Sequence, residues 1–321
     1  MDKGMVQSAL LQSVRSGFFK GLHGYVWIMK ILVPISFFTA LLVWTGALEK
    51  TQFLIAPVMG WLDLPPAAAL PLLIGTLANI YAGIAAMMVL PLTTEQMTLI
   101  AVFLLIAHSL IQEGAVQGAT GLNPFKAALL RLTAACAAVK LTALFVNPGA
   151  PAGPGEPTPA LSSAVPFGEM VSAWLGKTVS MGLVILLIIL FIMMLIEIAK
   201  TFGWIDSIVR FCRPALKVLG LSEKGGVIWM TSAVFGLLYG AAVIVEEVQG
   251  GGFEKTELEG LQISIGINHS MIEDPMLFMA LGLSAFWLWV PRLVMAVLVV
   301  QLFRLWHHFH AGRRTMAAAG R

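Results

Sequence analysis

Long apolar stretches recur along the whole chain, and they constrain its fold more than any other feature. A helix that crosses the hydrocarbon core of a bilayer needs about 20 apolar residues. Residues 25–48, 179–198 and 277–303 each provide that length. Only 12% of the residues are charged, against about 25% in a typical soluble domain, and the deficit is spread from end to end. The sequence therefore predicts an all-α integral membrane protein with several crossings.

Polar and apolar segments divide the chain into five parts. Residues 1–24 have apolar side chains every four positions with basic residues between them, which is typical of an amphipathic helix in the headgroup region. Residues 147–167 are rich in Pro and Gly and contain no Lys or Arg, which favours a flexible linker outside the cytoplasm. The expected parts are an interfacial helix at 1–24, a first membrane repeat at 25–146, the linker at 147–167, a second membrane repeat at 168–305 and a basic cytoplasmic tail at 306–321.

The two membrane repeats match each other at constant offsets. At an offset of 157, Gly46, Leu48, Glu49, Pro57, Leu62 and Leu64 fall on Gly203, Ile205, Asp206, Pro214, Leu219 and Leu221. At an offset of 161, Gly75, His108, Ser109, Ile111, Gln112, Glu113, Gly121, Arg131 and Leu132 fall on Gly236, His269, Ser270, Ile272, Glu273, Asp274, Gly282, Arg292 and Leu293. Chance explains Leu on Leu in an apolar chain, but not two His-Ser pairs with the same flanking residues. The sequence therefore predicts two structural repeats.

The distribution of basic residues predicts that the repeats are inverted. Loops rich in Lys and Arg stay in the cytoplasm, so we expect both termini and residues 200–224, with five basic residues, on the cytoplasmic side. The corresponding residues 49–64 of the first repeat contain only Lys50 and are expected outside. Equivalent loops on opposite faces require an odd number of crossings per repeat. The expected location is the cell (inner) membrane.

Each repeat contains four apolar segments, so one of them must not cross fully. In the first repeat we expect full crossings at 25–48, 67–90 and 124–146. The segments around His108 and His269 end in polar and glycine-rich stretches, and we expect them to be interrupted or re-entrant. Each inverted repeat would then have about three full transmembrane helices, one interrupted or re-entrant segment and an amphipathic helix. Paired interruptions of this kind point to the binding site of a transporter.

The interrupted segments carry most of the candidate site residues. Polar and ionisable side chains at membrane depth are costly, so they are first read as lining a functional cavity. The alternative is that they are hydrogen-bonding groups that hold helices together. The predicted substrate-binding residues are His108, Ser109, Gln112, Glu113, Asn268, His269, Ser270, Glu273 and Asp274.

Three chemistries suit these residues, and the sequence does not choose among them. Imidazole and carboxylate groups suit a divalent metal, for which His108, His269 and Glu273 are the candidate ligands. A histidine beside carboxylates suits proton relay. Hydroxyl, amide and imidazole groups also suit hydrogen bonding to a nucleoside-like solute.

Further polar residues lie in neighbouring spans. Arg131 and Arg292 follow the two motifs and are expected to pair with Glu113 and Asp274 or to bind an anionic group. Asn79, Tyr81 and Tyr239 lie in glycine-containing stretches and are candidates for lining the same cavity, although small-residue helix packing explains those glycines equally well.

The motifs LIAHSLIQEG and INHSMIEDP, with their flanking Gly and Arg-Leu positions, resemble those of the nucleoside-recognition or Gate family. That family includes spore maturation proteins A and B and the membrane gate regions of the bacterial ferrous-iron transporter. The resemblance covers residues 25–145 and 170–305. It implies a nucleoside or ferrous iron as the ligand. The chain departs from the iron transporter because it has no P-loop motif and no cysteine near either interrupted motif.

The sequence thus predicts a transporter that moves a small polar solute, nucleoside-like as the first choice, through a midplane site between two inverted repeats. One alternative is a divalent-metal (ferrous iron) permease or a component of a gate. Another is a non-transporting scaffold that acts with a partner membrane subunit or as a homo-oligomer. We expect contacts with the lipid bilayer, no nucleic-acid partner and no cofactor. No nucleophile–base set appears, so we do not expect an enzyme.

Overall fold

The computed structural model describes residues 3–47, 56–148, 165–204, 221–236 and 253–319, together with 207, 210, 211, 216, 218 and 219. This part of the chain is built from helices and has no strand. The helices are α1 (Lys3–Trp44), η1 (Pro66–Ala68), α3 (Ala69–Leu77), α4 (Ile80–Met87), α5 (Thr94–Ala107), α6 (Leu110–Ala119), α7 (Pro124–Val146), α8 (Phe167–Thr201), α10 (Glu223–Phe235), α12 (Lys255–Asn268), α13 (Glu273–Met279) and α14 (Ala285–Ala319).

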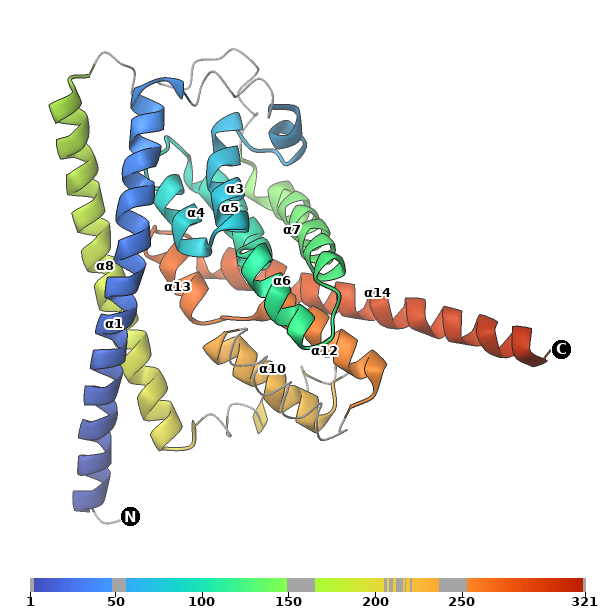
Figure 1. Cartoon of the computed structure of the whole chain (residues 1–321). Coiled ribbons are helices and arrows are strands. Elements are labelled where there is room, and N and C mark those ends of the chain that lie inside the picture. Colours follow the sequence, from blue (N-terminus) through green and yellow to red (C-terminus); the bar gives the residue numbers. More distant parts are fainter. Residues whose placement is uncertain are drawn as a thin grey trace.

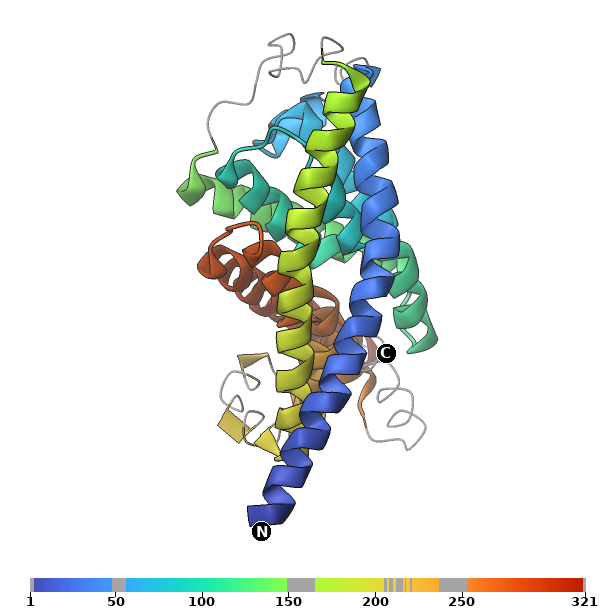
Figure 2. The ribbon, with the colours of Figure 1, turned by 90° about the vertical axis from the view of Figure 1, so that its left-hand side faces the viewer.

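Helices α1 and α8 form a long antiparallel pair along one side of the molecule (Figures 1 and 2). Near one end of the pair, the Ser13 and Thr201 hydroxyl oxygens lie 2.7 Å apart. Near the other end, the indole Nε1 of Trp44 donates to the Val165 carbonyl at 2.9 Å. The shorter helices pack beside this pair, and α13 lies next to its middle (Figure 1).

The expected interfacial helix at 1–24 is not separate from the first span. Helix α1 runs from Lys3 to Trp44 without a break. A methyl group at Gly17 would lie 2.5 Å from the Cα of Met194, so this part of α1 is packed tightly against the backbone of α8. Part of the apolar stripe at 1–24 therefore packs against a second apolar helix. The tail at 306–321 likewise continues α14, which extends to Ala319.

Five segments of the described chain are long and apolar enough to cross a membrane. They are Gly4–Trp44, Thr94–Ala119, Pro124–Val146, Phe167–Thr201 and Ala285–His307. The expected all-α membrane protein is therefore confirmed. The division into five sequence parts stays a prediction, and most of the linker at 147–167 lies outside the described residues.

The segment at 67–90, expected as a full crossing, instead folds back on itself. Helices α3 and α4 meet at Asn79, whose side chain accepts from the Ala82 amide at 2.9 Å and caps α4. A methyl group at Gly75 would lie 3.3 Å from the Cα of Gly83, which in a straight helix would be about 12 Å further along. Two glycines therefore allow the arms of this hairpin to touch.

The crossing that the hairpin does not make is supplied by the interrupted segment. Helix α5 ends at His108, Ser109 adopts a left-handed conformation with φ of 50°, and α6 begins at Leu110. The whole segment Thr94–Ala119 has the length and hydropathy of a span. The first repeat thus keeps three candidate crossings, which are α1, the segment of α5 and α6, and α7. The segment that folds back is the one of α3 and α4, not the interrupted one around His108.

Backbone geometry repeats at both sequence offsets. Gly46 and Gly203, which follow α1 and α8, have φ of 67° and 66°. Gly121 and Gly282, which precede α7 and α14, have φ of 95° and 83°. The helices α1 and α8 are equivalent by this spacing and run antiparallel (Figure 1). Inversion of the repeats across a membrane stays a prediction.

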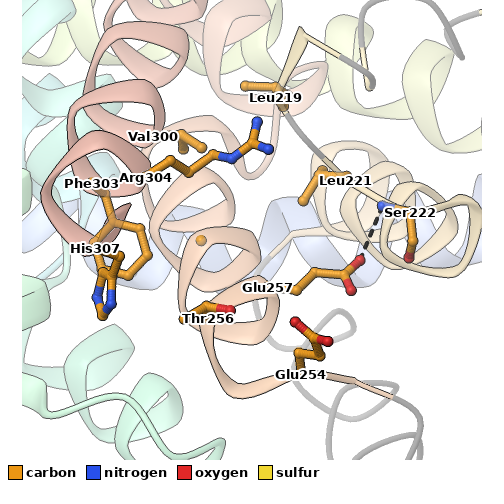
Figure 3. A pocket seen from close by; sticks show the side chains of 11 residues that line it. Leu219, Leu221, Ser222, Glu254, Thr256, Glu257, Val300, Phe303, Arg304 and His307 are labelled. Carbon is orange, nitrogen blue, oxygen red and sulfur yellow. Dashed lines mark hydrogen bonds between the residues drawn. The ribbon is translucent and has the colours of Figure 1, made fainter. Parts of the chain in front are cut away.

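A cavity of about 580 Å³ lies between α12, α14 and the residues just before α10, and Glu254, Glu257, Arg304 and His307 line it (Figure 3). Glu257 accepts from the Ser222 amide at 3.0 Å. None of the buried, unpartnered side-chain atoms in the described residues belongs to this cavity. The candidate site therefore lies elsewhere, at the helix breaks.

Candidate functional site

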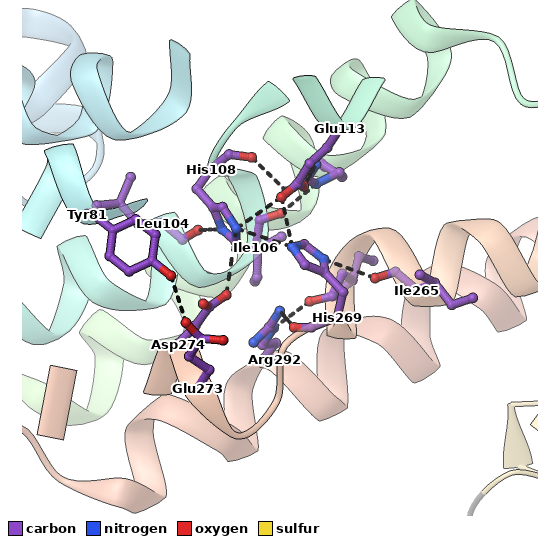
Figure 4. Close-up of polar contacts among 12 residues, drawn as sticks. Tyr81, Leu104, Ile106, His108, Glu113, Ile265, His269, Glu273, Asp274 and Arg292 are labelled. Atoms are coloured by element: carbon purple, nitrogen blue, oxygen red, sulfur yellow. Dashed lines mark hydrogen bonds and ion pairs between the residues drawn. The ribbon is translucent and has the colours of Figure 1, made fainter. Parts of the chain in front are cut away.

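The two helix breaks bring two histidines together at the interface of the two repeats (Figure 4). His108 follows α5 and His269 follows α12, and their Nε2 atoms lie 3.2 Å apart. Both residues are almost completely buried, with 4% and 1% of their surface exposed. Residues 161 positions apart in the sequence thus form a single centre.

Backbone carbonyl groups fix the orientation of both imidazole rings. His108 Nδ1 lies 2.7 Å from the Leu104 carbonyl oxygen, and His269 Nδ1 lies 3.1 Å from that of Ile265. A carbonyl oxygen only accepts, so each Nδ1 carries the hydrogen and each neutral ring presents an Nε2 lone pair to the centre.

Glu113, in the first turn of α6, completes the centre. Its Oε1 lies 3.1 Å from Nε2 of His108 and 3.1 Å from Nε2 of His269. Its Oε2 forms an ion pair with Nη1 of Arg131 at 2.5 Å, at angles outside those of a hydrogen bond. We call His108, Glu113 and His269 the central triad. Its donor atoms lie close enough to hold one metal ion.

Two buried arginines support the ends of the broken helices in the same way. Arg131, on α7, donates from Nε to the Ile106 carbonyl at 2.7 Å and from Nη2 to the His108 carbonyl at 2.9 Å. Arg292, on α14, donates from Nε and Nη2 to the carbonyls of the residues at the same offset, Ile267 and His269. A helix end leaves its last carbonyls without partners, and the guanidinium groups supply them.

The expected pairing of the arginines holds in one repeat only. Arg131 pairs with Glu113. Arg292 Nη1 and Asp274 Oδ2 are both buried, and neither has a hydrogen-bond partner among the described residues. Asp274 Oδ2 instead lies 3.6 Å from His108 Nε2.

Glu273 is not part of the triad, although its spacing from His269 predicted a shared face. Glu273 accepts a hydrogen bond from the Tyr81 hydroxyl at 2.7 Å. The carboxylate beside the two histidines is Glu113, so the structure groups Glu113 with His108 and His269 in place of the expected Glu273. Residues 270–272 lie outside the helices, so the i,i+4 geometry of a continuous helix does not apply.

A cavity of about 200 Å³ opens beside the triad. Trp27 of α1 also lines it and stacks edge-on against Tyr81, with ring centroids 5.7 Å apart. Trp27 was not predicted as a lining residue, because an aromatic residue near the start of a span is more typical of the membrane interface. The polar lining consists of Asn79, Tyr81, His108, Ser109, Gln112, Glu113, His269, Ser270, Glu273 and Asp274.

Three predicted residues do not line this cavity. Arg131 and Arg292 lie behind the triad at the helix ends. Asn268 is buried with 1% exposure, and its side-chain oxygen and nitrogen have no hydrogen-bond partner in the described part of the chain. Tyr239 lies outside the described residues.

The backbone at each break is bonded to a neighbouring helix. The Ser109 amide donates to the Gly75 carbonyl of α3 at 3.0 Å. In the second repeat, the Ser270 amide donates to the Ser232 carbonyl of α10 at 3.1 Å, and the next amide, of Met271, donates to the Ala233 carbonyl at 2.6 Å. These bonds satisfy amides that the interrupted helices leave free.

A second set of buried polar contacts joins the repeats. Gln117 Nε2 donates to the Gln262 carbonyl at 3.0 Å, and Gln262 Nε2 donates to the Thr120 carbonyl at 2.7 Å. The Thr120 hydroxyl donates to Gln262 Oε1 at 3.0 Å. These bonds connect the end of α6 to α12 and hold the two interrupted segments against each other.

Comparison with known proteins finds a family that resembles most of the first repeat. The Gate family, described as nucleoside recognition, matches residues 25–122. A protein of Bacillus subtilis (strain 168), described as the uncharacterized membrane protein YvoD, is 29% identical over 278 residues, which cover 84% of this chain and 87% of the relative. No solved structure matches the chain. Residues 25–122, which include α5, the break at His108 and α6, are therefore similar to the Gate family, described as nucleoside recognition.

Proposed function

We propose that this protein is a membrane transporter whose cargo passes the central triad. The observation that carries this proposal is the meeting of two helix breaks, one from each repeat, with His108 and His269 3.2 Å apart. Interrupted helices in corresponding positions of two repeats are the usual location of a transporter's cargo site. Such irregular backbone is tolerated in a membrane where protein or a cavity surrounds it.

The energetic cost of the site supports a functional role. The triad and the described residues around it include two guanidinium groups and three carboxyl groups, largely withdrawn from solvent (Figure 4). Polar groups that only hold helices together contribute about 0.6 kcal/mol on average. Burying ionisable groups for that gain alone is unfavourable, so a ligand that uses them is the better explanation.

The size of the cavity restricts the cargo in this conformation. At about 200 Å³ it is smaller than the roughly 300–1,000 Å³ of pockets for drug-sized ligands. A small polar solute or an ion fits this volume, whereas a nucleoside requires the cavity to open. The description of the Gate family nevertheless makes nucleosides the first organic solutes to test.

A non-transporting scaffold, or a gate subunit that needs another chain, is the competing function. It predicts no flux through this protein alone. A homo-oligomer or a partner membrane subunit would then supply the missing part of the path. We further propose that both termini lie in the cytoplasm and that the chain has no enzymatic activity.

Flux through liposomes that contain only this chain tests the proposal. The panel comprises nucleosides, small carboxylates and divalent cations. Gln112→Trp places a large side chain in the exposed part of the cavity lining, whereas the neighbouring Ile111, which is 68% exposed and does not line the cavity, gives the matched control Ile111→Trp. Saturable flux of one class, lost in Gln112→Trp and kept in Ile111→Trp, would support transport. Flux that appears only after a second chain is added would contradict it.

A further inference from the structure

We propose that the cargo is a first-row divalent transition-metal ion, bound by His108 Nε2, His269 Nε2 and Glu113 Oε1. This inference rests on the proposed transport function and names the class of its cargo. The three atoms come from both repeats, so the site exists only when the two helix breaks are together (Figure 4).

The electronic character of the three atoms calls for a cation between them. Both Nδ1 atoms have a carbonyl oxygen as partner, at 2.7 and 3.1 Å, and must donate to it. Each neutral imidazole therefore directs a lone pair toward the other ring and toward the Glu113 carboxylate. Three electron-rich atoms at separations of 3.1–3.2 Å repel one another unless a proton or a metal ion lies between them, and a metal ion satisfies all three lone pairs at once.

The separations match the edges of a metal coordination sphere. With metal–ligand distances of about 2.1 Å, neighbouring ligand atoms lie about 3.4 Å apart in a tetrahedral site and about 3.0 Å apart in an octahedral one. The observed 3.1–3.2 Å falls between these values for all three edges. The three ligand atoms would occupy one face of the ion's coordination polyhedron, and the other coordination positions would stay open.

Open positions are appropriate for an ion that must enter and leave. A structural zinc site usually has four protein ligands, whereas a site that exchanges ligands keeps a position free. Asp274 lies at the edge of the open side, with Oδ2 3.6 Å from His108 Nε2, buried and without a hydrogen-bond partner among the described residues. A small movement of α13 would add this carboxylate as a fourth ligand.

The surrounding residues orient the triad as second-sphere groups do in metal sites. Arg131 holds the far oxygen of Glu113 and also binds the His108 carbonyl, so it fixes two of the three ligands. Carbonyl partners at Nδ1 are typical of metal-binding histidines. Two imidazoles and one carboxylate suit ions such as Mn²⁺, Fe²⁺, Co²⁺ and Zn²⁺, whereas Mg²⁺ and Ca²⁺ prefer oxygen ligands throughout.

Binding of Co²⁺ and Zn²⁺ to the purified full chain in detergent tests the ion site directly. Titration calorimetry gives the affinity, and the visible absorption of Co²⁺ reports nitrogen and oxygen coordination. His269→Gln and Glu113→Gln should each weaken binding by at least about tenfold, since the loss of a ligand costs no less than the loss of a second-sphere partner. The exposed His23 provides the matched control, and His23→Gln should bind as the wild type does. Thermal unfolding confirms that each variant is folded. If Glu113→Gln does not fold, the binding measured for His269→Gln decides the test.

Transport of the ion is measured separately, with a metal-sensitive dye inside liposomes. Binding together with His269-dependent uptake supports the inference. Binding without uptake of any ion overturns the assignment of the metal as cargo. No binding of Mn²⁺, Co²⁺ or Zn²⁺, or equal binding by His269→Gln, overturns the metal site itself. Flux of an organic solute in that last case would leave the transporter proposal standing, so the two failures are distinguishable.

Discussion

Arg131 and Arg292, 161 residues apart, make the same pair of hydrogen bonds to the backbone. Each guanidinium binds the carbonyl of the histidine at the helix break and the carbonyl two residues before it. The geometry requires a planar group with two donors in a fixed fork, which Arg provides and Lys does not. Both arginines therefore act as supports of the two helix ends.

Arg131→Lys should lower the free energy of unfolding by about 1.5–3 kcal/mol, because one charged hydrogen bond to a buried carbonyl is lost. Denaturant unfolding in detergent measures the change. The exposed Arg304 serves as control, and Arg304→Lys should change stability by less than about 0.5 kcal/mol. Equal stability of both variants would show that the Arg131 fork is not needed.

Tyr81→Phe should also destabilise the protein, by about 1.5–3 kcal/mol, because Glu273 loses its hydroxyl partner at 2.7 Å. Thermal unfolding of the two proteins under one condition gives the comparison. The Tyr25 hydroxyl makes no hydrogen bond among the described residues, so Tyr25→Phe should have the smaller effect. A larger loss at Tyr25 would be inconsistent with this account.

Gly17→Ala should loosen the pair of long helices. The added methyl group would lie 2.5 Å from the Cα of Met194, and relief of such overpacking costs about 1–3 kcal/mol. Gly24→Ala in the same helix meets no atom within 4 Å and should be neutral or slightly stabilising. Thermal unfolding of the two variants side by side separates packing from helix propensity, and equal shifts would argue against close contact.

Metal binding at the central triad should weaken as the pH falls. Imidazole binds a metal only when its lone pair is free, so protons compete with the ion at both Nε2 atoms. We expect weaker Co²⁺ binding at pH 5.5 than at pH 7.5, because protons compete with the ion for the Nε2 lone pairs of two ligands. Calorimetric titration at the two pH values provides the measurement, and identical affinities would speak against histidine ligation.

Inverted repeats predict opposite labelling at the ends of α1 and α8. Thr45 and Trp204 are exposed and follow these helices. In a chain without native cysteines, Thr45→Cys should react with an impermeant thiol reagent in intact cells, and Trp204→Cys only after permeabilisation. Labelling of both from one face would refute the inversion and the assigned orientation.

The sequence predicted the membrane fold and the pairing of the two motifs, because both follow from the order of residue types along the chain. Apolar length gave the membrane class, and the repeated His-Ser pairs identified residues that the structure brings together. The Gate resemblance is confirmed for residues 25–122. Whether these residues bind a substrate stays a prediction.

Two local features could not be obtained from periodicity. The hairpin of α3 and α4 depends on close contact of Gly75 with Gly83, and glycine pairs in an apolar run also fit a straight span. The choice of Glu113 over Glu273 depends on the length of each break. Helix α6 resumes at Leu110, directly after Ser109, whereas α13 resumes only at Glu273, so Glu113 and its equivalent Asp274 do not take equivalent places at the two histidines.

The main-chain bonds at the two breaks have a mechanical consequence. The first break is tied to α3 by the single bond from Ser109 to Gly75, whereas the second is tied to α10 by two, from Ser270 and Met271. The two sides of the histidine pair are therefore unequal in stiffness. In the proposed transport cycle, movement of the α3–α4 hairpin would therefore break fewer of these main-chain bonds than movement of α10.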